Sequence, residues 1–182
     1  MKSLVFALLL ALAPASNHHL HLDDEISDKT VAPLVAALDG ARGRVVIEID
    51  SPGGEVEAGW QLVRAIERSA AHVVCVVDGE ADSMAFVVLQ ACDERVITER
   101  SLLMAHEAAA GVRGQPDDIQ NGLNHLRRIN EQLVRFCARR MGMRWQRLSA
   151  MIAHGRELWL GPEEALRLHA VDRVVVSVGQ VL

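Results

Sequence analysis

Apolar residues recur along the chain at two spacings, which predict where strands and helices lie. Short runs of β-branched and other apolar residues predict strands, and a run that is apolar throughout is typical of a parallel strand covered on both faces. Apolar residues three or four positions apart predict helices with one face toward a core. We expect strands at 18–22, 44–50, 73–77, 95–98, 102–104 and 171–178. We expect helices at 30–38, 54–68, 83–91, 116–141, 144–153 and 162–168.

A strand, a helix and a second strand follow one another between residues 44 and 77, and this order predicts a right-handed βαβ unit. We therefore predict an α/β fold, and 182 residues are enough for one domain with a substantial core. The helix at 116–141 is the longest, is amphipathic and lies outside the βαβ unit. A helix of this kind is typical of a packing surface, often one between subunits.

The N-terminus has the pattern of an export signal. Lys2 precedes an apolar run over 4–13, and residues 13–15 (APA) match the small residues of a cleavage site. The alternative is an uncleaved anchor, but the run is shorter than the roughly 20 residues that cross a bilayer. We therefore predict a signal peptide at 1–15 and a single mature domain at 16–182, exported to the periplasm or secreted.

Composition narrows the functions open to this chain. Half of the residues are hydrophobic, 24% are charged, and the formal net charge is −5. The low aromatic content and the lack of a basic block argue against nucleic-acid binding. The three cysteines, Cys75, Cys92 and Cys137, match no zinc pattern, and their odd number leaves at least one free or paired between chains. We expect buried thiols, with a Cys75–Cys92 disulfide as the open alternative.

Cleavage after residue 15 would place Ser16, Asn17 and His18 at a free amino terminus. A free amine with a histidine in third place can bind square-planar Cu²⁺ or Ni²⁺. The alternative is a solvated polar tail, which we prefer. We therefore expect neither a metal nor a cofactor.

Three features of the chain suit serine hydrolase chemistry. Residues 51–54 (SPGG) follow a predicted strand and begin a helix, where glycines allow close approach and N–H groups can hold an oxyanion. Ser83 follows a predicted tight glycine turn at Gly79, between a strand and a helix, as nucleophilic serines do. His106 comes at the end of a later predicted strand, which would aim it into a cleft. Each feature alone is common as a turn, a helix cap or a polar histidine, but in this order they are specific.

Together the motifs resemble those of the Clp-type serine peptidases, the ClpP group within the ClpP/crotonase superfamily, over about residues 20–176. The matching segments are 49–54 (IDSPGG), 79–84 (GEADSM), 104–107 (MAHE) and 159–165 (WLGPEEA). The resemblance implies a ClpP/crotonase-like superhelix of ββα units with a protruding long helix. It also implies that Ser83 is the nucleophile and His106 its general base. The N–H groups of Gly54 and Met84 would form the oxyanion hole.

The chain departs from the family pattern at two positions that bear on activity. Ala153 stands where the family has its third catalytic residue, an aspartate, and an alanine cannot orient an imidazole. Glu157 is the nearest candidate for that role, and a Ser–His dyad is the alternative. Asp82 replaces a small apolar residue of the family, and its carboxylate would oppose a developing oxyanion unless it points away.

A lysine base, as in the related signal peptide peptidases, is disfavoured by composition alone. The only lysines are Lys2, which leaves with the signal, and Lys29, which precedes the first βαβ unit. The arginines cannot substitute, because their pKa is too high for a base.

We therefore predict an exported Clp-like serine endopeptidase that cleaves peptides or unfolded segments through a Ser83 acyl-enzyme. The alternative is a catalytically weak or inactive peptide-binding oligomer on the same fold, and an acyl-CoA-handling crotonase relative is a third reading that would not need these motifs. The helix at 116–141 resembles the handle by which family members stack, so we expect a homo-oligomer. A compartment outside the inner membrane has no ATP pool and the chain has no P-loop, so an ATP-driven unfoldase is not an expected partner.

Overall fold

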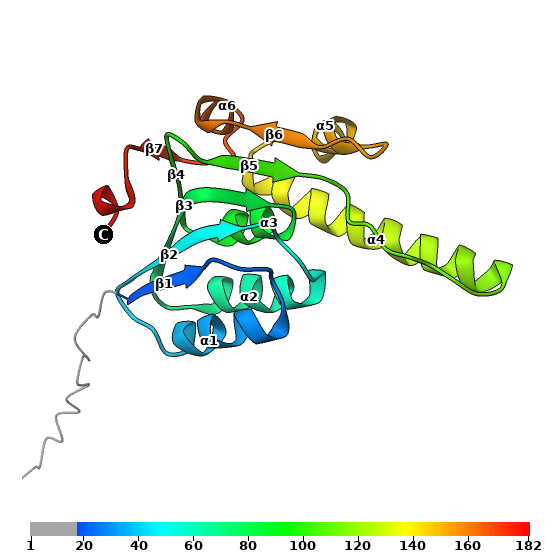
Figure 1. Cartoon of the computed structure of the whole chain (residues 1–182), viewed down its shortest axis with the longest axis horizontal. Coiled ribbons are helices and arrows are strands. Elements are labelled where there is room, and N and C mark those ends of the chain that lie inside the picture. Colours follow the sequence, from blue (N-terminus) through cyan, green and yellow to red (C-terminus); the bar gives the residue numbers. More distant parts are fainter. Residues whose placement is uncertain (1–17) are drawn as a thin grey trace, which may run out of the picture.

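A seven-stranded sheet forms the centre of the computed structural model, which describes residues 18–182 (Figure 1). Its strands are β1 (His18–Leu22), β2 (Arg44–Ser51), β3 (His72–Asp82), β4 (Glu94–Thr98), β5 (Leu102–Ala105), β6 (Leu158–Leu160) and β7 (Arg173–Val175). The helices are α1 (Asp28–Leu38), α2 (Val56–Arg68), α3 (Met84–Ala91), α4 (Pro116–Arg140), α5 (Trp145–Ile152) and α6 (Pro162–Arg167), followed by the 3-10 helix η1 (Val178–Gln180). The predicted α/β fold is confirmed. The predicted signal peptide and the first two residues of the candidate copper site lie outside the described residues.

The sheet is mainly parallel and branches at β3. The strands β1-β2-β3-β4-β7 are parallel neighbours, while β5 pairs in parallel with β3 and antiparallel with β6. Residues 74–77 of β3 pair with β4, whereas residues 80–82 pair with β5. Strand β3 therefore continues past Gly79 to Asp82, and the predicted strand end at Val77 and tight turn at Gly79 are wrong.

Gly79 allows β3 to pass from one partner strand to the other. Its φ is 134°, and a Cβ there would lie 2.1 Å from Oδ1 of Asp50. The same oxygen accepts a hydrogen bond from the N–H of Glu80 at 3.0 Å, and Oγ of Ser101 accepts one from the N–H of Gly79 at 2.9 Å. At the branch, side-chain oxygens thus accept the backbone hydrogen bonds that a neighbouring strand would otherwise accept. The periodic pattern of apolar residues does not predict these side-chain contacts.

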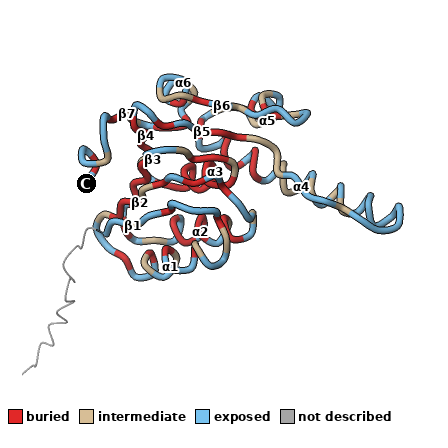
Figure 2. Tube along the Cα trace, viewed as in Figure 1, coloured by how far each residue is buried: buried red, intermediate tan, exposed pale blue. Residues whose placement is uncertain are grey.

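The two faces of the sheet are covered differently. One face packs against α1, α2 and α3, and all eight residues of α3 are buried, as the red trace in Figure 2 shows. The other face carries a smaller valine cluster, which the C-terminal segment helps to cover. Its buried members are Val46, Val74, Val76, Val96, Val175 and Val181.

The ends of several predicted elements differ in the structure, and those of the last strand and the first helix have a clear local cause. The pattern predicts a last strand over 171–178, but β7 ends at Val175, and Val176 is 68% exposed with its N–H donating to Oε1 of Gln180. The first helix begins at Asp28 rather than at residue 30, because the Ser27 hydroxyl caps it and Thr30 completes a capping box.

A disulfide joins Cys75 of β3 to Cys92, which directly follows α3. The expectation of buried thiols is therefore wrong for this pair, and the alternative that the sequence left open is confirmed. Cys137 is free and buried, and burial raises the pKa of its thiol to about 12.

Helix α4 projects from the body of the molecule (Figure 1). Its C-terminal half supplies buried Leu133, Phe136 and Cys137 to the core, whereas Ile119 and Leu123 near its start are exposed. Across residues 18–182, no helix combines the length and the apolar character needed to cross a membrane.

Candidate active site

Ser83 lies where β3 ends and α3 begins. Its φ of 54° and ψ of −114° belong to a conformation that residues other than glycine rarely adopt. Its N–H donates a hydrogen bond to the carbonyl oxygen of Met104 in β5 at 2.8 Å. The sharp turn therefore falls at Ser83 itself. The N–H of Met84 lies at the start of α3, where the helix dipole favours negative charge.

The Nε2 atom of His106 lies 2.7 Å from Oγ of Ser83. Ser83 directly follows β3 and His106 directly follows β5, so the carboxyl ends of two parallel neighbours bring the two side chains together. This distance is within the reach that a general base needs to take the serine proton. The predicted nucleophile and the predicted base are thus in contact.

The glycine loop after β2 lies directly against the Ser83 turn. Gly53 has a φ of 90°, and a Cβ there would lie 2.6 Å from the carbonyl oxygen of Asp82 and 2.8 Å from the N atom of Met84. Ser51 fixes the loop from within, because its Oγ accepts from the N–H of Gly53 at 3.2 Å and donates to the carbonyl oxygen of Asp24 at 2.7 Å. Only a glycine permits the loop to approach the turn this closely.

Two backbone N–H groups at these turns are available to a ligand. Within residues 18–182, neither the N–H of Gly54 nor that of Met84 donates a hydrogen bond to another backbone group. Ile26 clamps the loop on either side of Gly54, since its N–H donates to Gly53 at 2.6 Å and its carbonyl accepts from Glu55 at 2.8 Å. Unpaired N–H donors next to a nucleophile are what an oxyanion hole requires.

Glu157 lies one residue beyond the β5–β6 pairing on the side of His106, and among the described residues it forms no hydrogen bond or ion pair with His106. Ala105 of β5 pairs with Leu158 of β6 in antiparallel register, and His106 and Glu157 are the next residue along each strand. The Glu157 carboxylate accepts a hydrogen bond from Nε1 of Trp159 at 3.0 Å. Among the described residues, no carboxylate forms a hydrogen bond or ion pair with His106.

Ala153 directly follows α5, and its methyl group offers nothing to an imidazole. The structure therefore brings together Ser83 and His106, and it leaves the third position of the predicted triad without a bonded acid.

Asp82 is a buried carboxylate next to Ser83, the predicted nucleophile. Its Oδ1 has no hydrogen-bond partner among residues 18–182. Burial, followed by the negative charges of Glu80 and Glu157, raises the pKa of Asp82 to about 6. The sequence places Asp82 beside Ser83, but the effect of Glu157 on it depends on the pairing of β5 with β6.

An apolar pocket opens beside Ser83 and His106, and the pattern of residues along the chain does not indicate it. The apolar face of the long helix α4 indicates one wall of the pocket, but residues of α3 and α5 form the other walls. Its apolar lining includes Val56, Met84, Val87, Leu133, Leu148 and Ile152.

Asn130 of α4 also lines this pocket and holds the segment that follows His106. Its side-chain oxygen accepts from the N–H of Ala108 at 2.7 Å, and its Nδ2 donates to the carbonyl of Ala108 at 3.2 Å. The amide thus pairs with the chain two residues beyond His106, a role that a single asparagine among the apolar residues of a helix face does not signal in sequence.

The chain is similar to known proteins over most of its length. A family model described as Clp protease matches residues 17–178. ATP-dependent Clp protease proteolytic subunit 3 of Rhizobium meliloti is 25% identical over 162 residues, which are 88% of this chain and 82% of that protein. The ATP-dependent Clp protease proteolytic subunit of Chlorella vulgaris is 29% identical over 160 residues, 86% of this chain and 78% of that protein. The residues matched by the family model include both Ser83 and His106.

Proposed function

The chain belongs to the Clp protease family, and on that premise we propose that it is a serine endopeptidase that hydrolyses peptides or unfolded protein segments. The observation that carries the proposal is the 2.7 Å contact between Nε2 of His106 and Oγ of Ser83. The unpaired N–H groups at the adjacent turns support it.

The proposed reaction has two acyl-transfer steps. Nε2 of His106 takes the proton of the Ser83 hydroxyl as Oγ attacks the peptide carbonyl carbon, and the N–H groups of Gly54 and Met84 hold the resulting oxyanion. The C–N bond then breaks, and His106 gives its proton to the leaving amine. Water, deprotonated by the same imidazole, then attacks the carbonyl carbon of the Ser83 ester. The ester C–O bond breaks, His106 returns the proton to Oγ of Ser83, and the second product leaves as a carboxylic acid.

We propose Glu157 as the carboxylate that orients His106. His106 directly follows β5 and Glu157 directly precedes β6, next to the paired residues Ala105 and Leu158, which supports this role. The carboxylate must rotate away from Trp159 to reach Nδ1 of His106, since it accepts from the Trp159 indole in the structure. Without that rotation the site works as a Ser–His dyad.

The apolar pocket supports a substrate with an apolar side chain next to the cleaved bond. Its walls offer aliphatic groups of α3, α4 and α5, for example Val87, Leu133 and Ile152. Burying an apolar side chain there would contribute about 1.5–3 kcal/mol to binding.

We further propose that the protein is exported and acts as a homo-oligomer. The Cys75–Cys92 disulfide supports export, because disulfides persist in oxidising compartments. Ile119 and Leu123 on the projecting part of α4 offer apolar contacts for a second copy. The names of the relatives describe proteolytic subunits of ATP-dependent proteases. An exported protein would work without ATP, on substrates that are already unfolded.

The alternative function is peptide binding without cleavage. Asp82 favours it, because a buried carboxylate with an unpaired oxygen next to the nucleophile opposes an oxyanion once it is ionised.

A fluorophosphonate probe separates the two functions. We expect the probe to label the wild-type protein and the Ser177→Ala control, whose substitution lies in the exposed segment before η1, but not Ser83→Ala. Equal labelling of wild type and Ser83→Ala would contradict the peptidase proposal. Peptide binding without labelling would establish the alternative.

A further inference from the structure

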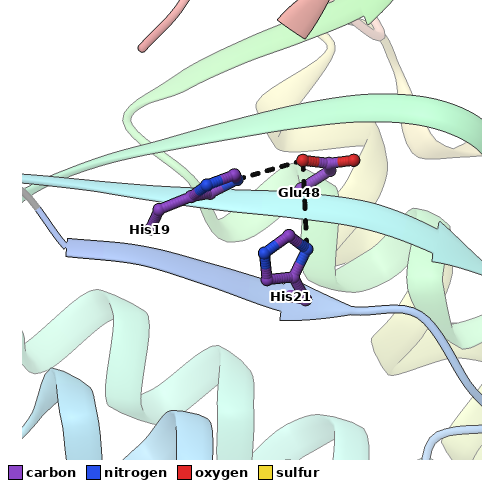
Figure 3. Close-up of side chains that lie close together, drawn as sticks. All are labelled: His19, His21 and Glu48. Carbon is purple, nitrogen blue, oxygen red and sulfur yellow. Dashed lines mark hydrogen bonds and ion pairs between the residues drawn. The ribbon is translucent and has the colours of Figure 1, made fainter.

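Two histidines of β1 and a glutamate of β2 lie close together, as Figure 3 shows, on the face of the sheet that carries the valine cluster. His19, His21 and Glu48 each offer one ligand atom, and these atoms all lie within 4.8 Å of one another. None of the three lines the pocket beside Ser83 and His106. The cluster is therefore separate from the site already described.

The sheet itself holds the three residues in place. His21 and Glu48 are direct partners in the parallel pairing of β1 with β2, and His19 stands two residues earlier on the same face. The intervening Leu20 points to the other face and packs against the main core. The backbone geometry of the cluster is thus fixed by strand pairing rather than by a loop.

The distances suit a small cation. Nε2 of His19 lies 3.0 Å and Nδ1 of His21 lies 3.9 Å from Oε2 of Glu48. Ligands about 2.0 Å from a tetrahedral Zn²⁺ are about 3.3 Å apart, so slight side-chain rotations would close the site. A donor set of two imidazoles and one carboxylate also binds first-row divalent metals in preference to Mg²⁺ or Ca²⁺.

We propose that His19, His21 and Glu48 bind one first-row divalent cation, with Zn²⁺ as the representative ion. Three protein ligands leave one position of a tetrahedral cation for water. The side chains are 32%, 53% and 26% exposed, so the ion enters from solvent without any rearrangement of the fold. Once bound, it links the edge strand β1 to β2.

The chain contains a matched control for a simple ion pair. His72 and Asp93 also form a histidine–carboxylate pair, with Nδ1 and Oδ2 3.8 Å apart and a His72 side chain that is 56% exposed. This pair is not part of a three-ligand cluster in the described residues. A histidine next to a carboxylate is therefore present in both places, and only the β1–β2 cluster offers three ligands.

Titration of the untagged protein with Zn²⁺ in a calorimeter tests the proposal. We expect one Zn²⁺ per chain. The affinity should fall at least about tenfold in His19→Ala, His21→Ala and Glu48→Gln, because mutating even a residue that only hydrogen-bonds to a metal ligand lowers affinity by that much. His72→Ala should bind as the wild type does. Circular dichroism of each variant checks that it is folded.

Three further measurements locate the ion. His18→Ala should leave Zn²⁺ binding unchanged, which separates the cluster from an amino-terminal site. Co²⁺ should give the visible absorption of a tetrahedral site in wild type but not in His21→Ala. Ser83→Ala should bind Zn²⁺ normally, so the metal proposal stands or falls independently of peptidase activity. Unchanged affinity in His21→Ala, or an equal loss in His72→Ala, would overturn it.

Discussion

Ser83 and Asp82 are neighbours in the chain, yet their side chains have opposite surroundings. The Ser83 hydroxyl meets an imidazole nitrogen at 2.7 Å, next to two unpaired N–H donors. Oδ1 of Asp82 has no hydrogen-bond partner among residues 18–182. Its burial and the charges of Glu80 and Glu157 all raise its pKa. The attacking side of the site is preorganised, whereas the carboxylates nearby form no bond with the base. The position of the chemistry is thus set by the fold, and we expect its rate to depend on these acids.

Gly53→Ala should have the largest effect, because it disturbs the preorganised side. The new Cβ would lie within 2.8 Å of the backbone of Asp82 and Met84, at a φ of 90°. The loop must shift away from Ser83, and we expect kcat/KM for a peptide substrate to fall about 10²–10³-fold, as when an oxyanion donor is lost. Fluorogenic peptide hydrolysis measures the change.

Gly40→Ala is the control for the backbone strain alone. Gly40 has a φ of 78°, but a Cβ there meets nothing within 4 Å. It should lose some stability and keep its activity. Equal activity losses in the two variants would show that the approach of the Gly53 loop to the Ser83 turn is not needed for catalysis.

Glu157→Gln tests whether the carboxylate side contributes to catalysis. If Glu157 orients His106, kcat/KM should fall about tenfold, a modest part of what an established triad acid supplies. Glu80→Gln is the matched control, because Glu80 also raises the pKa of Asp82 but does not stand opposite His106. An unchanged or higher kcat/KM in Glu157→Gln would show that Glu157 does not orient His106 and that the site works as a Ser–His dyad.

Asp82→Asn should have the smallest effect, and its sign depends on pH. The folded-state pKa of Asp82 is raised from 3.8 to about 6, so its ionisation costs stability as pH rises through that window. At pH 8 we expect the variant to be more stable than wild type by about 1 kcal/mol, or about 2–4 °C in Tm. The difference should vanish as the pH falls below about 3, where the acid is protonated in both states.

The same substitution should change activity in the same direction. The ratio of kcat/KM of Asp82→Asn to that of wild type should rise as pH increases through about 6, where the wild-type carboxylate becomes charged. A ratio that is constant between pH 5 and pH 8 would show that the charge of Asp82 does not destabilise the oxyanion.

Much of the site follows from the sequence because its parts lie at the ends of strands. The resemblance of the motifs implies that Ser83 and His106 work as a pair, and in the structure they follow β3 and β5 at one edge of the parallel sheet, in contact with each other. The continuation of β3 through Gly79 could not be predicted. It depends on hydrogen bonds that the N–H groups of Gly79 and Glu80 donate to Ser101 and Asp50, which are distant in sequence.

Contacts between distant segments account for the remaining differences. The Cys75–Cys92 bond, the contact of Asn130 with Ala108 and the shortened β7 each depend on how two separate elements approach. Periodicity reports the face that a residue presents to the core, but it does not report its neighbour on the next element.

The Cys75–Cys92 disulfide closes the segment that carries Ser83 into a covalent ring. The two cysteines are 17 positions apart and enclose Ser83. Closing a loop of this length restricts the unfolded chain and stabilises the fold by about 3 kcal/mol. It also means that a single backbone cut anywhere between them, by another copy of the enzyme or by a foreign protease, leaves both fragments attached.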